Sequence, residues 1–293
     1  YMKNARMSKE RFRASELALE NLKFTKRKYE EYMALGAPLE VVKLVFSDEK
    51  MEYFPSPTGD DRKLLFTARM VQNGAPTDEN LFVAERLGAG WESRSKPVLG
   101  RVNTRVNEGA SSISADGEYM VFTACNRPDG VGKCDLYYSY FDPVKGWGFP
   151  ELLPGKINTK RWESQPTLGP DGTTLYFVRG SNNQSDDLDI MVAYKDDEGN
   201  WSTVEKLPFE VNSSGRERSP FIHFDGTTLY FPGRGATHLA ALGQGRRHNQ
   251  PRSVAQALGN PQQIFACKTD AALGRVMRAA PLVQKYRRSM ARL

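Results

Sequence analysis

A stretch of the form SQPTLGPDGTTLYF, at Ser164–Phe177, recurs along this chain and sets its period. Each version has an acidic turn, Asp-Gly or Asp-Asp, and ends on an aromatic residue a few positions later. The closing aromatics lie 56, 55 and 54 residues apart, at Phe66, Phe122, Phe177 and Phe231. A regular step of this size is typical of repeat proteins, in which each unit packs against its neighbours. This repeat constrains the fold more strongly than any other feature of the chain.

Three further markers keep the same step. One is a short apolar run that follows Asn or Asp, another is a tryptophan and the last is an asparagine. They are Asn80-Leu81-Phe82, Asp135-Leu136-Tyr137 and Asp189-Ile190-Met191; Trp91, Trp147 and Trp201; and Asn103, Asn158 and Asn212. Because the markers stay in register over more than half the chain, chance does not explain them.

Each repeat unit predicts β structure. Asp-Gly between two short apolar runs is a strong hairpin signal, because Gly accepts the positive φ that the turn needs and Asp bonds to its own backbone. The run after the turn, such as Leu175-Tyr176-Phe177, is apolar at every position and must be covered on both faces. A second apolar run, a turn with tryptophan and a weaker strand complete the unit. Four antiparallel strands about every 55 residues are the plan of a β-propeller blade.

We therefore predict a mainly β fold, an incomplete β-propeller of about three and a half four-stranded blades, preceded by one α-helix. The helix is expected in residues 1–40, where apolar residues recur at 3- and 4-residue spacings before Gly36 and Pro38. The partial propeller takes residues 41–235 and a basic tail takes residues 236–293. A blade count of this kind would leave apolar faces uncovered at the two end blades, in Val45–Thr67 and Ser219–Phe231.

The tail breaks the repeat in the middle of a blade. After Phe231 the pattern requires an Asp-Leu-aromatic strand and a tryptophan, but residues 236–293 contain neither. We expect these residues to be non-native or disordered, as from a shifted reading frame, to leave the fourth blade incomplete and to contribute nothing to function. A genuine basic interaction tail is the alternative. The chain begins at Tyr1 in a helix pattern, without a signal peptide, so we expect it to be part of a longer protein.

The net charge of +6 belongs to the tail. Residues 236–293 hold ten of the 41 basic residues and one of the 35 acidic residues, which leaves 31 basic and 34 acidic residues in the rest. A body with a charge of about −3 does not have the basic groove of a nucleic-acid-binding protein, so we expect no nucleic acid partner. No stretch has the ~18 consecutive apolar residues of a membrane span, so we expect no transmembrane segment.

Two of the three cysteines lie at positions where a disulfide could form. Cys125 and Cys134 flank the predicted loop between the second and third strands of one blade, where a disulfide could close across the hairpin. Two reduced thiols are the alternative, and two cysteines by themselves do not decide the redox compartment. Cys267 has no evident partner.

A glutamate recurs eight residues before the turn aspartate in every unit, at Glu52, Glu108, Glu163 and Glu217. Equivalent positions of successive blades form a ring, so these carboxylates could face the channel and attract a cation or a basic peptide. The alternative is architectural: each glutamate accepts backbone N–H bonds or pairs with a neighbour such as Arg161 or Arg218. Recurrence in every blade favours the architectural role, because ligand sites usually break the symmetry.

We expect no catalytic residue, metal site or cofactor. His223 is the only histidine before the tail and lies in a first strand, so a Ser-His-Asp arrangement has almost no candidates. The chain has no Cys-x-x-Cys pair and no Gly-rich phosphate loop. Asp186, Asp187 and Asp189 could hold Ca²⁺, but a solvated acidic loop is the better interpretation.

The repeat motif, Ser-x-x-Pro-Asp-Gly-x-x-Leu-x-Phe followed by Asp-Leu-Tyr, resembles the propeller repeats of TolB and its relatives. The entry to the propeller, with Ala18–Phe24, Tyr53-Phe54-Pro55 and Leu65-Phe66-Thr67, resembles proteins of the OmpA family of Bacteroidota. In those proteins tetratricopeptide helices precede the propeller, and one PorE-like member belongs to the type IX secretion machinery. The resemblance covers residues 14–235.

This resemblance implies an exported protein at the periplasmic face of the outer membrane, with envelope or secretion-system proteins as partners. Peptidoglycan would be bound only through a C-terminal domain that is absent here. The function expected is therefore a non-enzymatic protein–protein interaction scaffold of the bacterial cell envelope. The alternative is a cell-surface glycan-binding or hydrolase-associated propeller module, for which Trp162 beside Glu163 is the one hint.

Overall fold

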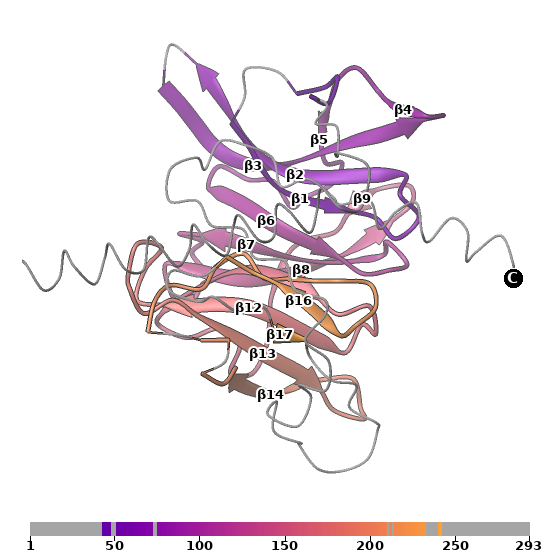
Figure 1. Cartoon of the computed structure of the whole chain (residues 1–293). Coiled ribbons are helices and arrows are strands. Elements are labelled where there is room, and N and C mark those ends of the chain that lie inside the picture. The colour runs from indigo at the N-terminus through magenta and orange to yellow at the C-terminus, as the bar shows by residue number, and fades with distance from the viewer. Residues whose placement is uncertain are drawn as a thin grey trace, which may run out of the picture. The chain divides into compact units, whose positions relative to one another are not determined.

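The computed structural model describes residues 43–47, 51–72, 75–209, 211–212, 214–232 and 240–241. All of them belong to one compact unit, and they form strands, turns and loops without a helix (Figure 1). The helix predicted in residues 1–40 lies outside the described residues, as does the tail apart from Ala240–Ala241.

The strands form four antiparallel sheets that follow one another along the chain. The first contains β1 (Met51–Pro57), β2 (Lys63–Gln72) and β3 (Ala75–Leu87), with β4 (Gly90–Trp91) and β5 (Lys96–Pro97) both paired to β3. The second contains β6 (Asn107–Ile113), β7 (Tyr119–Cys125) and β8 (Cys134–Asp142), with β9 (Gly146–Trp147) and β10 (Glu151–Leu152) both paired to β8.

The third sheet contains β11 (Trp162–Leu168), β12 (Thr174–Gly180), β13 (Asp189–Lys195) and β14 (Trp201–Lys206) in simple order. The fourth contains β15 (Phe221–Ile222), β16 (Thr228–Tyr230) and β17 (Ala240–Ala241). Ala240–Ala241 pairs with Thr228 and Leu229, so residues of the tail contribute a short third strand that the sequence did not predict.

The sheets are the successive blades of an incomplete β-propeller, which confirms the predicted fold class. The first strand of each blade contacts the first strand of the next, as β1 contacts β6, β6 contacts β11 and β11 contacts β15. Figure 1 shows the first three blades as layers that follow the colour from indigo to salmon. The third strand ends beside the recurrent tryptophan, where Arg86, Phe141 and Lys195 each lie against the Trp of their own blade.

The core consists of apolar layers between blades. In β7 the side chain of Val121 packs with the cluster shared with the third blade, whereas Met120 and Phe122 pack with the cluster shared with the first blade. Phe122 and its equivalent Phe177 are fully buried. The second strand is thus covered on both faces, as its uninterrupted apolar run predicted.

The first blade differs from one expectation. Phe46 stacks on Phe66 with ring centroids 5.5 Å apart and meets Trp91 edge-on, and Phe66 is buried. In the fourth blade Leu229 and Phe231 are buried too. Phe66, Leu229 and Phe231 are therefore covered, contrary to the prediction, and Phe46 covers Phe66 by turning back onto the first sheet. In the same two ranges Val45, Met51, Phe221 and Phe224 are exposed, as predicted.

The Asp-Gly turns have the predicted geometry. Gly117, Gly172 and Gly226 have φ of 78°, 67° and 68°, and Asp61 takes the same role in the first blade with φ of 57°. Each turn aspartate accepts a backbone N–H two residues ahead, for example Asp171 from Thr173 at 2.9 Å. The left-handed residue after a hydrogen-bonded turn matches the twist of the two strands that it joins.

We predict that Phe122→Ala lowers the free energy of unfolding by about 3–5 kcal/mol, since a fully buried aromatic side chain leaves a cavity between two blades. Urea denaturation followed by circular dichroism measures the change. The control is Phe149→Ala, whose side chain is 68% exposed and whose loss should cost less than about 1 kcal/mol. Equal effects of the two variants would contradict the inter-blade core.

The turn of the fourth blade predicts a pH dependence. Burial raises the pKa of Asp225, but hydrogen bonds from Thr227 and Thr228 and the neighbouring His223 outweigh it and lower the pKa to about 2. Because the ordinary pKa is 3.8, ionised Asp225 stabilises the fold above that pH and the stabilisation is lost as the pH falls towards 2. Asp225→Asn should therefore flatten the decline in unfolding free energy between about pH 4 and pH 2. Urea titrations across this range test it, and an equally steep decline in the variant would contradict the role of Asp225.

Candidate functional site

The recurrent glutamates lie beside a kink in the first strand of each blade. Two residues after each glutamate stands a non-glycine residue in the left-handed region: Phe54, Ala110, Gln165 and Ser219, with φ of 51°, 48°, 57° and 43°. In the first three blades the pairing register shifts at this point, which marks a β-bulge. The glutamates therefore sit at the same strained position of every blade.

Glu108 and Glu163 are held from both sides. The carboxylate of Glu163 accepts two hydrogen bonds from Thr159, from the backbone N–H at 3.1 Å and from the side-chain hydroxyl at 2.6 Å. It accepts a third from the Nε–H of Arg179 at 2.8 Å. Glu108 has the same partners in its own blade: the N–H and hydroxyl of Thr104, and Arg127 with Nη1 at 3.7 Å. Each carboxylate thus ties the loop that enters the blade to the first strand. Through its arginine, Glu163 is also joined to the second strand of its blade, and Glu108 is joined to the loop that follows the second strand.

Glu52 keeps part of this plan, and the contact of Glu217 with the preceding blade comes from its backbone. Glu52 is half-buried and accepts the hydroxyl of Ser47 at 2.6 Å, although Ser47 stands one residue further away than Thr104 and Thr159 do. Glu217 is fully buried, and its backbone N–H donates to the carbonyl of Leu188 in the preceding blade at 3.0 Å.

Burial favours the architectural role for three members of this ring, whereas Glu52 is half-buried. Glu108, Glu163 and Glu217 are all 0% exposed, so their carboxylates are not accessible to a cation or peptide in the channel. Burial raises the pKa of Glu108 and Glu163, while the threonine and arginine partners lower it in part. We assign these glutamates to the architecture. The two neighbours named as examples for this role have other partners: Arg161 pairs with Asp187, and Arg218 donates to the carbonyl of Asn183.

A second recurrent contact joins successive blades. The left-handed residue of one blade donates its N–H to a side chain of the blade before it: Ala110 to Thr67 at 2.8 Å and Gln165 to Thr123 at 3.2 Å. The third blade has Val178 at the equivalent position, and Ser219 donates instead to Oε1 of Gln165 at 2.7 Å. The sequence signal was the threonine directly after Phe66 and Phe122, which periodicity alone does not assign to this contact.

The recurrent asparagines have a clear structural role. Asn158 accepts the N–H of Leu136 at 2.8 Å and donates to its carbonyl at 2.9 Å, so its amide pairs with the third strand like a neighbouring strand. Asn103 pairs with Leu81 and Asn212 pairs with Ile190 in the same manner. Each asparagine lies 22 residues after its partner, at the end of its blade.

Cys125 and Cys134 face each other as a cross-strand pair of β7 and β8 and are joined by a disulfide in the structure. Cys125 is half-buried and Cys134 is buried. Cys267 lies outside the described residues.

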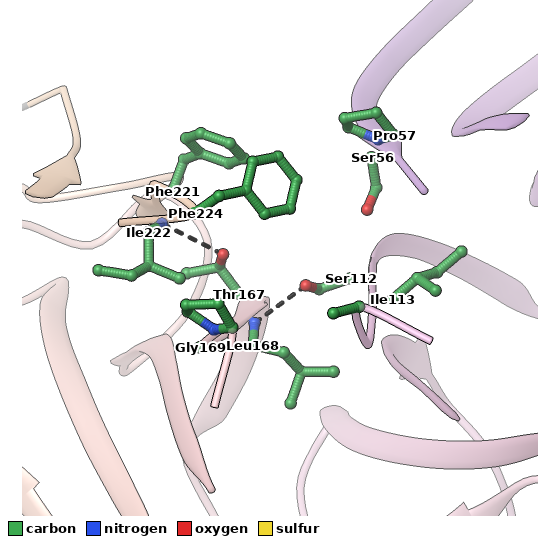
Figure 2. Close-up of a pocket in the computed structure, with 12 residues that line it drawn as sticks. Ser56, Pro57, Ser112, Ile113, Thr167, Leu168, Gly169, Phe221, Ile222 and Phe224 are labelled. Atoms are coloured by element: carbon green, nitrogen blue, oxygen red, sulfur yellow. Dashed lines mark hydrogen bonds between the residues drawn. The ribbon is translucent and has the colours of Figure 1, made fainter. Parts of the chain in front are cut away.

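The ends of the four first strands meet around an axial pocket (Figure 2). Across the blades, the N–H of Leu168 donates to the Ser112 hydroxyl at 2.9 Å, and the N–H of Ile222 donates to the Thr167 hydroxyl at 3.3 Å. The pocket is lined by Ser56, Pro57, Ser112, Ile113, Ala115, Thr167, Leu168, Gly169, Pro170, Phe221, Ile222 and Phe224. None of these lining residues carries an ionisable side chain. Figure 2 shows the rings of Phe221 and Phe224 on one side of the pocket, across from Ser56 and Pro57.

The other chemistry-bearing residues have structural partners. His223 accepts the N–H of Asp225 at 3.2 Å and lies edge-on to Phe224 and Tyr230. Asp186 pairs with Arg216, and Asp189 pairs with Lys206, both at 2.7 Å. The described part of the chain contains no group of three or more ligand-type side chains that could hold a metal ion. Nor do the residues described form a helix with the length and hydropathy of a membrane span.

We predict that Glu163→Ala lowers the free energy of unfolding by about 3 kcal/mol or more, because it leaves the half-buried Arg179 guanidinium without its carboxylate and the Thr159 N–H without its acceptor. Glu163→Gln keeps one oxygen as an acceptor for Thr159 and should cost less. Urea denaturation at neutral pH measures both. The exposed Glu205→Ala is the control, and an effect of Glu163→Ala no larger than that of Glu205→Ala would contradict the architectural role.

The topology defines this protein as part of a β-propeller. Comparisons with known proteins bear on this fold only. No protein-family model matches the chain, and no curated protein matches it. The solved structures that resemble it include TolB from Acinetobacter baumannii, at 18% identity over 64% of this chain and 39% of that one, with a TM-score of 0.40. The chain thus spans about two fifths of that TolB.

Two further structures have the same TM-score of 0.40. A putative TolB from Agrobacterium tumefaciens is 15% identical over 67% of this chain and 74% of its own length. An alpha-L-arabinofuranosidase from Lactobacillus brevis is 13% identical over 65% of this chain and 66% of its own length.

Proposed function

We propose that this chain is a non-enzymatic protein–protein interaction module of the bacterial cell envelope, and that the exposed phenylalanines of its axial pocket contact a protein partner. The observation that carries this proposal is the lining of the pocket. Phe221 and Phe224 are 36% and 45% exposed there, while acids, bases and thiols are missing from the twelve lining residues. A pocket with two exposed aromatic rings and no ionisable side chain suits binding rather than acid–base catalysis.

The chemistry of the blades supports the same proposal. The buried ionisable side chains of the repeat are engaged by partners within the fold: Glu163 by Thr159 and Arg179, and Asp135 by the N–H groups of Val131 and Gly132. Burial raises the pKa values of these two carboxyl groups, and the hydrogen bonds lower them in part. Structural hydrogen-bond networks shift pKa values in this way as well as active sites do.

The place of this module in the cell is proposed from the sequence resemblance. The TolB-like repeats and the entry segment of OmpA-family proteins support a position at the periplasmic face of the outer membrane, with tetratricopeptide helices before the propeller. Association with type IX secretion is part of the same proposal. Contact with peptidoglycan, which the resemblance assigns to a separate C-terminal domain, is not part of this proposal.

The alternative function, a glycan-binding or hydrolase-associated module, depended on Trp162 as a sugar platform. Its side chain is only 9% exposed and packs against Val178, Leu188 and Cys134. A tryptophan in this environment has little surface for a sugar ring, so the protein-binding hypothesis is preferred.

Photo-crosslinking tests the proposal. A benzoylphenylalanine at position 224, in the full-length protein in envelope membranes, should form an adduct with a protein partner. Phe221→Ser should reduce the yield of that adduct about tenfold or more, because an exposed aromatic at the centre of an interface contributes much of its binding energy. Phe149→Ser is the matched control, because Phe149 is exposed but lies outside the pocket. No protein adduct at position 224, or an equal loss with the control, would contradict the proposal.

A further inference from the structure

The Cys125–Cys134 disulfide occupies a position where each of the first three blades uses a different contact. This position joins the end of the second strand to the start of the third. In the first blade it holds Arg69 and Glu79, which lie 4.0 Å apart as an ion pair. In the third blade it holds Gly180 and Leu188, which pack so closely that a Cβ on Gly180 would lie 2.5 Å from Leu188. Only the second blade has a contact here that a redox reaction can open.

The disulfide also lies where the second blade meets the third. Cys134 belongs to a cluster with Trp162, Val178 and Leu188, all from the third blade, and Cys125 packs against it. The equivalent contact between the first two blades is a hydrogen bond, from the N–H of Glu79 to Asn107 at 2.9 Å. The same position therefore connects neighbouring blades in both cases.

The loop closed by the disulfide docks on the third blade as well. Asp135 accepts the N–H groups of Val131 and Gly132 at 3.1 and 3.0 Å and so fixes the shape of this loop. A Cβ on Gly132 would lie 2.3 Å from the carbonyl oxygen of Arg161 and 2.8 Å from that of Thr159. Thr159 is the residue that holds the buried Glu163. The loop thus presses on the segment that anchors the first strand of the third blade.

We propose that this disulfide is a redox-sensitive latch between the second and third blades. A dithiol is the chemical class of reductant. Its thiolate attacks the Sγ of the more exposed Cys125, the S–S bond breaks, and the Cys134 thiolate leaves and takes up a proton. The second thiol of the reductant then displaces Cys125 from the mixed disulfide, so two protein thiols form and the dithiol becomes a disulfide. Opening the latch frees the loop and loosens residues 159–165 across the blade boundary.

Hydrogen–deuterium exchange with mass spectrometry tests this inference on the full chain with Cys267→Ser, which removes the third thiol. Dithiothreitol is the reductant, and the oxidised and reduced forms are compared. Reduction should raise the exchange rate of amides in residues 159–165 about tenfold, while the β2 amides of the first blade stay unchanged. The double variant Cys125→Ser/Cys134→Ser should exchange fast at residues 159–165 with or without dithiothreitol.

Two further outcomes would overturn the proposal. Faster exchange confined to residues 125–134 would show a local hairpin staple without a link to the third blade. Faster exchange in every blade would show global unfolding instead of a latch. Trp162→Ala provides a second check, because it keeps both cysteines but removes the side chain that packs on Cys134. In this variant residues 159–165 should exchange fast and respond to the reductant less than about twofold.

Discussion

The second and third blades have apolar side chains on both faces of their sheets, and exposing either face to water is unfavourable. Val121 points into one inter-blade layer while Met120 and Phe122, its neighbours on the same strand, point into the other. A blade of this kind is stable only when another blade or a covering segment lies on each side. The stacking of blades is therefore the constraint from which the remaining features follow, including the return of Phe46 onto the first sheet.

Apolar layers alone would let neighbouring sheets slide, and polar contacts at fixed points prevent this. In the second, third and fourth blades the left-handed residue turns one N–H towards the blade before it, where Thr67, Thr123 or Gln165 accepts it. The left-handed conformation of a non-glycine residue costs about 1–2 kcal/mol, which the cross-blade hydrogen bond and the held glutamate offset. Recurrent polar residues of this chain thus act mainly as fasteners of the architecture.

Function then depends on the residues that do not take part in these recurrent contacts. The ends of the first strands converge on the axial pocket, whose exposed phenylalanines break the blade symmetry that the glutamates obey. The disulfide breaks this symmetry too, since Arg69 and Glu79 fill its position in the first blade. Departures from the repeat are therefore better guides to function here than the repeat itself, because what recurs in every blade serves the stacking of blades.

The sequence by itself determined the period, the β character and the blade plan. These rest on local chemistry: the Asp-Gly turns, the apolar runs and the tryptophan turns act within a few residues and so leave a periodic trace. The cross-strand position of Cys125 and Cys134 was also readable, because a hairpin of known turn position places the ends of its strands together.

Only the tertiary structure decided which recurrent residues bind each other. Asn158 finds its partner 22 residues earlier, and Leu168 finds the Ser112 hydroxyl 56 residues away, in another blade. Sequence periodicity shows that such residues recur but not which neighbour they meet, so it did not identify Arg127 and Arg179 as the partners of Glu108 and Glu163. The short third strand at Ala240–Ala241 escaped prediction for a related reason. Two alanines do not show the residue pattern of a strand. They are a strand here only because they pair with the edge of β16.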